Sequence, residues 1–403
     1  MGLSGGVDST LVAALLKEKG CRVIGVTMSQ WKGDLPPLPD GRKLHGSCYG
    51  PDEAQDIEDC KKFCAEHDIE YHVIDVKEEY QKQVLDYFKA EYRAGRTPNP
   101  CIRCNNLVKF GALLSGVEKM GITYDYFCTG HYARLVRPTE SLPLSYGDTE
   151  YPHSLTPAMI ACATDSAKDQ AYFLYRIPSA TLEKVRFPLA SFKKQDVFKM
   201  AKERSLAAAE KEESQDFIPS EYFEILFKDK PSVPGDIIDL DGHVLGHHRG
   251  IEHYTVGQRR GLGVSSSRPL YVHSIDSEKN LVVLAPDNDL FSASLIADDW
   301  AWPAGYEPQT AFSAMAKIRL ASRPVPVTVE PYCGEGDFKG KAYRVVFETP
   351  QRAVAPGQSV VIYRDGVISG GGVICKAEKA DSADVEKAAE ELKKIESEPN
   401  HSR

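Results

Sequence analysis

The sequence predicts an α/β domain with a parallel sheet in its first half and small β-rich domains in its second half. Up to about residue 210, short β-branched runs alternate with helical stretches, which is typical of βαβ units. From residue 231 to 364, short β-type runs follow one another with turn residues between them, which is typical of small barrels. We therefore expect a Rossmann-like domain, a small central β-rich domain and a C-terminal β-barrel.

The elements of the first half alternate in a regular order. Ligands of such sheets bind beyond the carboxyl ends of the strands, where residues 4–10, Met28 and the Gly130-His131 pair would all fall. The expected elements are a helix over 11–19, a strand over 21–27, a helix over 51–67, a strand over 72–76, a helix over 79–94 and a strand over 124–129.

Composition and charge indicate what kind of protein this is. The chain has 403 residues, 42% of them hydrophobic and 27% charged, which is ordinary for a globular protein with more than one domain. No apolar run reaches the length of a membrane span, so we expect a cytoplasmic monomer. The net charge of −9 argues against a basic surface throughout but leaves room for a local basic face. We expect the ten cysteines to be reduced.

The segment Ser4-Gly5-Gly6-Val7-Asp8-Ser9-Thr10 has the composition of a phosphate-binding loop. Its glycines let the backbone approach an anion, and its hydroxyls stand at the N-terminus of a helix, where free N–H groups favour negative charge. An ordinary Gly-rich turn with a capping residue is the alternative. Such a loop normally follows a buried strand, yet only three residues precede it, so we expect a late start or a truncated first strand.

A second cluster of chemistry lies between residues 95 and 105, which read GRTPNPCIRCN. The two prolines stiffen the chain ahead of Cys101 and Cys104. A Cys-x-x-Cys pair is consistent with a redox pair, with ligands of a metal or Fe–S centre, or with two buried thiols. Because Arg96 and Arg103 are close in sequence, we expect a lowered thiol pKa.

Seven separate motifs are spread over nearly the whole chain. They are SGGVDS, GVTM-x-x-W, GRTPNP-x-x-x-CN, CTGHYAR, KDQAYFL, TVGQRRGLG and PQRAVAPGQ. Together, and in this order, they resemble one family, the tRNA-uridine 2-sulfurtransferases, or 2-thiouridylases, of the PP-loop ATP pyrophosphatase superfamily.

The resemblance implies an activity and its parts: ATP with Mg²⁺ adenylates the C2 oxygen of the wobble uridine, position 34 of a tRNA, and a sulfur nucleophile then displaces AMP. It implies an ATP-binding catalytic domain over 1–210, a tRNA-binding central domain over 211–292, a barrel over 293–375 and a charged tail over 376–403, helical or disordered. It assigns ATP contacts to Gly2, Leu3, Ser4, Gly5, Gly6, Val7, Asp8, Ser9, Met28 and Gly130, catalysis to Cys104 with Cys101, and tRNA or target-base contacts to Asn99, Pro100, Cys101, His131, Lys168, Asp169, Gln170, Arg319 and Gln358.

One departure from the family concerns the sulfur route. The family carries a second cysteine in a D-S-x-x-I-C-F-like segment, whereas residues 213–219 here read ESQDFIP. Three interpretations stay open. In the first, Cys101 and Cys104 do both jobs through a persulfide and a disulfide. In the second, they hold a [4Fe–4S] cluster whose open iron delivers sulfide, with Cys162 or Cys128 as the third ligand and Cys48 ranked behind both. In the third, the chain is a paralogue that binds tRNA or nucleotide without thiolating. The sequence does not identify the sulfur donor.

Simpler interpretations exist for several of these residues. His131 would also suit the core, and Lys168 with Asp169 a solvated charge pair. Cys60 and Cys64, four residues apart on an expected helix, indicate core packing. A different PP-loop ligase or amidotransferase with a small carbonyl substrate is a further alternative for the whole chain.

Overall fold

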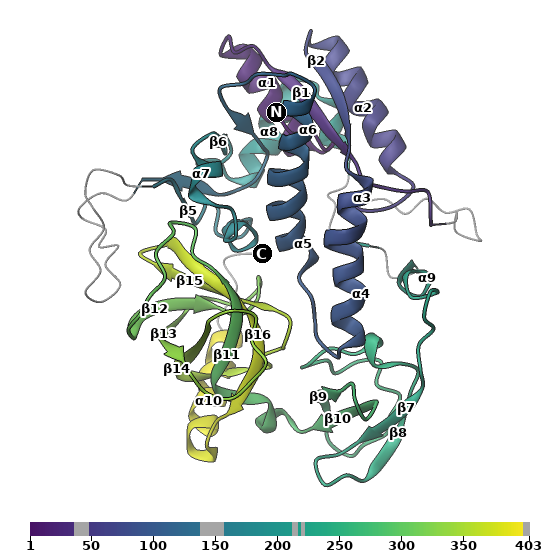
Figure 1. Cartoon of the computed structure of the whole chain (residues 1–403), viewed down its shortest axis with the longest axis vertical. Coiled ribbons are helices and arrows are strands. Elements are labelled where there is room, and N and C mark those ends of the chain that lie inside the picture. Colours follow the sequence, from purple (N-terminus) through teal and green to yellow (C-terminus); the bar gives the residue numbers. More distant parts are fainter. Residues whose placement is uncertain (36–47, 138–156, 212–216, 219–221, 398–403) are drawn as a thin grey trace. The chain divides into compact units, whose positions relative to one another are not determined.

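We analysed a computed structural model of the chain, which describes residues 1–35, 48–137, 157–211, 217–218 and 222–397 (Figure 1). The chain forms two compact units. The first contains the described residues of 1–86, 100–137 and 157–228, and the second those of 87–99 and 229–397. No helix in the described ranges is both long and apolar enough to cross a membrane.

The first unit is built on a parallel sheet, as the sequence predicts. Strand β1 (Ile24–Ser29) pairs in parallel with β2 (Glu70–Asp75), and β3 (Phe127–Cys128) pairs in parallel with β6 (Val185–Arg186). Residues 1–3 lie between these two pairs: the amide of Gly2 donates to the carbonyl of Cys128, and that of Leu3 to the carbonyl of Val26. The short segment ahead of the loop therefore occupies the central strand position of the sheet.

Helices surround this sheet and extend the unit. They are α1 (Val7–Glu18), α2 (Glu53–Glu66), α3 (Lys77–Tyr80) with its π-helical continuation η1 (Gln81–Leu85), α5 (Pro100–Arg103) with the π-helix η2 (Cys104–Ala112), α6 (Leu113–Lys119), α7 (Ser179–Leu182), α8 (Lys194–Glu203) and α9 (Phe223–Leu226). Helix α4 (Asp86–Arg93) follows η1 and belongs, from Tyr87 on, to the second unit. A small antiparallel pair, β4 (Arg134–Val136) with β5 (Met159–Ala161), and the 3-10 turns η3 (Ala171–Leu174) and η4 (Ala207–Glu210) complete it.

The core of the first unit contains three of its cysteines. Cys60, Cys64 and Cys128 are buried in one apolar cluster with α1 and α8. The core interpretation of Cys60 and Cys64 is therefore confirmed. Cys128 also packs in this core, so its sulfur is a small hydrophobic group there.

The second unit contains the two β-rich parts expected from the sequence. In the central one, β7 (Gly235–Ile238) lies between β8 (Val244–His248) and β10 (Leu281–Ala285), and β9 (Tyr271–Asp276) follows β10. The C-terminal barrel has six antiparallel strands: β11 (Phe291–Ala301), β14 (Ala342–Arg352), β13 (Val325–Tyr332), β12 (Phe312–Lys317), β15 (Ser359–Arg364) and β16 (Val367–Lys379). It closes because β11 also pairs with β16.

The described part of the C-terminal tail contains the end of a strand and a helix. Strand β16 continues through Lys379, and helix α10 (Ser382–Ser397) follows it. Val385 and Ala388 are buried against Phe291, so this helix has a packed face.

Candidate active site

The glycine-rich loop forms a compact turn at the start of α1. The hydroxyl of Ser9 donates to the carbonyl of Gly6 at 3.1 Å, and the amide of Ser4 donates to the hydroxyl of Ser9 at 3.2 Å. Gly5 has a φ of +75°, which only glycine adopts without strain. Gly6 caps α1 in an extended conformation without a side-chain hydrogen bond, so the helix N-terminus is open to an anion.

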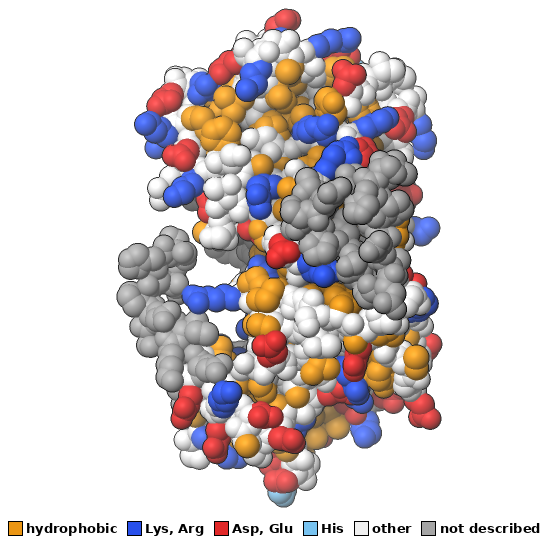
Figure 2. Space-filling view, turned by 90° about the vertical axis from the view of Figure 1, so that its left-hand side faces the viewer, with side chains coloured by type: hydrophobic (Ala, Val, Ile, Leu, Met, Phe, Trp, Pro, Cys, Tyr) orange, Lys and Arg blue, Asp and Glu red, His pale blue; other side chains and the backbone are white. Residues whose placement is uncertain are grey.

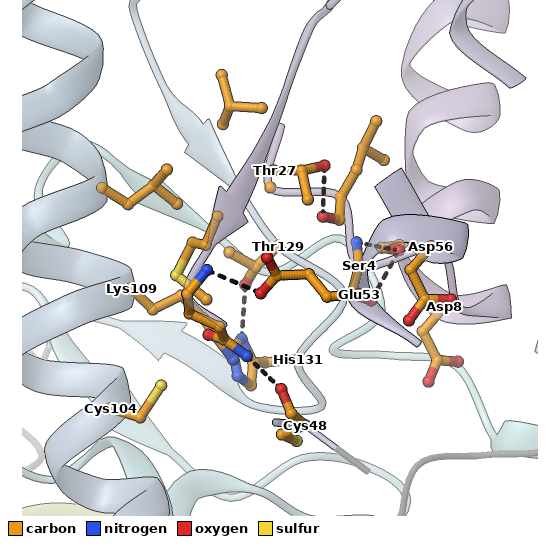
Figure 3. A pocket seen from close by; sticks show the side chains of 18 of the residues that line it. Ser4, Asp8, Thr27, Cys48, Glu53, Asp56, Cys104, Lys109, Thr129 and His131 are labelled. Carbon is orange, nitrogen blue, oxygen red and sulfur yellow. Dashed lines mark hydrogen bonds between the residues drawn. The ribbon is translucent and has the colours of Figure 1, made fainter. Parts of the chain in front are cut away.

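This loop lines a pocket of about 290 Å³ at the carboxyl ends of the parallel strands (Figure 3). Its walls come from the loop, the end of β1, the start of α2, η2 and the segment after β3. The lining residues are Gly2, Leu3, Ser4, Asp8, Ser9, Val26, Thr27, Met28, Gln30, Cys48, Gly50, Glu53, Asp56, Ile57, Cys104, Lys109, Leu113, Thr129, Gly130, His131 and Gln170.

Many of the predicted site residues meet in this pocket. Loop residues, Met28, Gly130, His131, Gln170 and Cys104 all line it, although they are spread over 170 residues of sequence. Other predicted residues do not line it: Gly5, Gly6, Val7, Asn99, Pro100, Cys101, Lys168, Asp169 and Cys162, as well as Arg319 and Gln358 of the second unit.

Gly130 stands where a side chain would disturb the loop. A Cβ atom there would lie 3.0 Å from the amide nitrogen of Ser9 and 3.1 Å from the carbonyl carbon of Asp8. Both are backbone atoms that cannot rotate away. Glycine is thus required for the segment after β3 to pack against the phosphate-binding loop.

His131 is a buried pocket wall. Its Nδ1 lies 2.8 Å from the hydroxyl of Thr129, and its ring packs near Phe110 and Phe187. Burial, with a further effect of the Lys109 charge, lowers the pKa of His131 well below its usual value. The ring is therefore neutral at neutral pH and supplies no cation for phosphate.

The Lys168-Asp169-Gln170 motif orders the chain around the pocket. The Asp169 carboxylate accepts from the amide of Ala163 at 2.8 Å, and Gln170 exchanges two hydrogen bonds with the backbone of Tyr132. Lys168 is exposed. Asp169 and Gln170 therefore position the segment that carries His131.

Cys104 starts the π-helix η2, and Cys101 lies in α5 just before it. π-Helical turns are rare and frequently mark functional sites. Burial raises the pKa of the Cys104 thiol to about 11 and that of Cys101 to about 12. The expectation of a lowered pKa is wrong, because Arg96 is paired with Glu91 and Arg103 donates to the carbonyl of Gln83.

The pocket also contains residues that the sequence did not single out. Glu53 accepts from the hydroxyl of Ser29 and, at 2.8 Å each, from the amides of Gln30 and Trp31, so it fixes the chain after β1. Lys109 is a cation near Cys104 that opposes the rise in its pKa. The one available signal was the position of Lys109, five residues after the end of the Cys-x-x-Cys pair.

Cys48 is the third cysteine close to this site. It is exposed, it lines the pocket with Cys104, and its charge contributes to the raised pKa values of both Cys101 and Cys104. Cys162 lies after β5, where its carbonyl accepts from Arg134. Cys48, which the sequence ranked last among the candidates, therefore shares the pocket, whereas Cys162 and Cys128 do not line it.

In the second unit, Gln358 holds the segment that leads to Asn99. Its side-chain Nε2 donates to the backbone carbonyls of Thr97 at 3.1 Å and Pro98 at 3.2 Å. The backbone amide of Thr97 donates to the carbonyl of Pro356. A Cβ on Gly357 would lie 2.9 Å from the Thr97 backbone. The PGQ motif of the barrel thus contacts the main chain of the GRTPNP motif and holds it in place.

Basic residues of the second unit differ in their surroundings. Arg259 and Arg260 are exposed, and Arg319 is exposed after β12. Arg352 instead pairs with Asp287 at 2.6 Å and lies over the ring of Tyr271. Over the face shown in Figure 2, basic and acidic side chains are interspersed.

Comparisons with known proteins agree with this architecture. Residues 1–219 match a family described as the tRNA methyl transferase HUP domain, 224–286 the tRNA methyl transferase PRC-barrel domain, and 292–374 the aminomethyltransferase beta-barrel domain. A protein of Endomicrobium trichonymphae named tRNA-specific 2-thiouridylase MnmA is 41% identical over 93% of this chain and 98% of its own length. The chain belongs to the tRNA-specific 2-thiouridylase family.

Other members of this 2-thiouridylase family match over the same extent. The protein with this name from Roseiflexus castenholzii is 37% identical over 93% of the chain and 98% of its own length. That from Geobacter metallireducens is 39% identical over 92% and 95%, respectively. The predicted fold class and family are confirmed: a HUP domain with a parallel sheet, a PRC-barrel domain and a six-stranded barrel.

Lys109 gives the 2-thiouridylase site a testable pH dependence. Its positive charge favours the Cys104 thiolate, so Lys109→Gln should raise the pKa of Cys104 further above about 11. In a Cys101→Ser background, the rate of Cys104 alkylation by iodoacetamide at pH 8 should fall, by roughly tenfold for a shift of about one pKa unit. The exposed Lys119→Gln is the control, and an unchanged pH profile for Lys109→Gln would contradict the assignment.

Proposed function

We propose that this protein is an ATP-dependent tRNA 2-thiouridylase that replaces the C2 oxygen of the wobble uridine, position 34, with sulfur. The observation that carries the proposal is that a phosphate-binding loop and Cys104 line one pocket. The names of the relatives support it. The proposal includes a cytoplasmic location, where tRNA and ATP meet, and action as a monomer.

The chemistry follows from the leaving group. A carbonyl oxygen leaves poorly, so its attack on the α-phosphate of ATP, with loss of pyrophosphate, turns it into part of a good leaving group. A sulfur nucleophile then forms a bond to C2, and AMP departs with the electron pair of the C2–O bond. When the nucleophile is hydrosulfide, HS⁻, the replacement of oxygen by sulfur is not a redox reaction. The sulfur bonds to C2, its proton is lost, and the product is the C2 thiocarbonyl.

The chain's own residues suit the first half of this reaction. The open N-terminus of α1, with Ser4 and Ser9, would hold the phosphates. Glu53 and Asp56 offer carboxylate oxygens on the pocket wall, the ligand type that Mg²⁺ prefers. Met28 and Gly130 border the space left for the nucleoside.

For the second half, we propose that Cys48, Cys101 and Cys104 hold a [4Fe–4S] cluster. All three are free thiols. They are close enough that the charge of Cys48 affects the pKa values of both Cys101 and Cys104. Among the described residues, the group whose ligand atoms lie within 4.8 Å of one another is Asp239, Asp241 and His243, so the three sulfurs are not gathered for a single ion. A cluster spaces its thiolates more widely, and with three cysteine ligands it supplies one iron open to inorganic sulfide.

Several further assignments belong to the same proposal. Asn99, Pro100 and Cys101 would lie against the target base, and a flipped uridine would enter beside Cys104. Exposed Lys168, Arg259, Arg260 and Arg319 would contact the tRNA backbone, where basic side chains fix position without reading sequence. The remaining predicted residues would shape the surfaces that contact the base and the tRNA backbone: His131, Asp169, Gln170 and Gln358.

The decisive experiment supplies ATP, Mg²⁺, sulfide and a tRNA transcript to protein reconstituted anaerobically with iron and sulfide. We expect AMP, pyrophosphate and 2-thiouridine in equal amounts. The matched control is the same transcript with cytidine at position 34, which should yield no thiolated base. AMP release without thiolation of either transcript would overturn the function and point to another adenylating enzyme.

A further inference from the structure

A buried lysine is joined to the phosphate-binding loop. The Nζ of Lys194 lies 2.7 and 2.8 Å from the two carboxylate oxygens of Asp8. The hydroxyl of Tyr132 donates to the same carboxylate at 2.8 Å. Lys194 opens α8 and is 186 residues away from Asp8 in sequence. The contact therefore exists only in the folded first unit.

The surroundings hold the lysine in this one position. Lys194 is 7% exposed, and its Nζ lies 4.8 Å from the ring centre of Phe198 and 5.8 Å from that of Tyr132. Its backbone amide donates to Asp165 at 2.8 Å. A buried ammonium is costly unless a carboxylate pairs with it, and Asp8 is that partner.

The location of Asp8 gives the pair a functional meaning. Asp8 lies in the first turn of α1, lines the pocket, and stands beside the N–H groups that would receive phosphate. An unpaired carboxylate at this point would repel a triphosphate. The loop also differs from the G-x-x-x-x-G-K-[ST] loop in having no lysine of its own.

We propose that Lys194 is the positioning residue of the phosphate-binding loop: its buried cation cancels the charge of Asp8 and fixes that carboxylate, so that the loop accepts the triphosphate of ATP. This inference rests on the proposed use of ATP. Lys194 does not line the pocket, so it acts through Asp8 and does not touch the nucleotide.

Equilibrium binding of the α,β-methylene analogue of ATP at saturating Mg²⁺ tests the proposal. Lys194→Met should weaken binding by at least about tenfold, because like charges placed together cost several kcal/mol. The control is Lys193→Met, an exposed lysine next to it, which should bind as the wild type does. Lys194→Arg should keep most of the affinity, since it keeps the charge.

The double variant Asp8→Asn/Lys194→Met separates charge cancellation from packing. It removes both charges, which lets the pair be tested even if Lys194→Met alone fails to fold. Its affinity for the analogue should exceed that of Lys194→Met by at least about threefold, because the unpaired carboxylate is gone. An affinity as weak as that of a folded Lys194→Met protein, or wild-type affinity in folded Lys194→Met, would overturn the proposal and leave the pair a structural link between α1 and α8.

These measurements use neither tRNA nor sulfide. Absence of thiolation by the wild type would therefore overturn the proposed function without deciding the role of Lys194. Conversely, wild-type nucleotide affinity in Lys194→Met would overturn this inference while thiolation by the wild type stood.

Discussion

Replacing Cys104 with serine should abolish thiolation while ATP is still consumed. Cys104 lines the same pocket as the glycine-rich loop and stands at the start of the π-helix η2. In the proposed function, the loop acts in adenylation and the cysteine in sulfur transfer. We expect the yield of 2-thiouridine to fall by roughly 10³-fold or more, the size found when a reacting group is removed, with tRNA-dependent AMP formation retained.

Both products should be measured in the same reactions, AMP by chromatography and 2-thiouridine by mass spectrometry of digested tRNA. The matched control is Cys21→Ser, an exposed cysteine of the same unit that does not line the pocket. Thiolation at the wild-type rate by Cys104→Ser would show that Cys104 is not part of the sulfur-transfer site.

Replacing Cys48 with serine should remove the cluster. After anaerobic reconstitution, we expect the wild type to bind about four irons and to absorb broadly in the visible range. Cys48→Ser should lose most of this absorption and iron, because only two of the three proposed thiolates remain. The readouts are the visible spectrum and the iron and sulfide content of the protein, and neither depends on activity.

Cys162→Ser is the variant to compare with Cys48→Ser. The sequence predicted Cys162 as the third ligand, whereas in the structure it follows β5 and does not line the pocket. It should keep the cluster. Loss of the cluster in Cys162→Ser but not in Cys48→Ser would reverse the assignment. A wild-type protein that takes up no cluster would favour the persulfide and disulfide route through Cys101 and Cys104.

The sequence predicted the fold class and much of the site, because those features are encoded locally. Alternating β-branched and helical stretches indicated the parallel sheet, and the Ser4–Thr10 loop carries its glycines, hydroxyls and helix start in one short segment. Gly130, His131 and Cys104 follow from motifs in the same way. Each signal depends on residues a few positions apart, which determine local backbone geometry.

What a single motif did not reveal was the electrical environment of each group. Arg96 is adjacent to the cysteines in sequence, yet it pairs with Glu91, and Lys109 is the cation that acts on Cys104. Burial then raises the thiol pKa values, which neighbours in sequence did not suggest. Burial and pairing depend on which surfaces meet when the chain packs.

The sequence by itself thus determined an α/β nucleotide-binding domain with β-rich partners, the family, and the loop and cysteine motifs. Only the tertiary structure decided that Cys48 joins Cys104 at the pocket, that Glu53 fixes the chain after β1, and that Lys194 holds Asp8. The physical reason is the distance along the sequence between the groups that interact. Turns, helices and strands follow from interactions within a few residues, whereas these contacts form only when segments far apart in sequence fold onto one sheet and shield their charges from water.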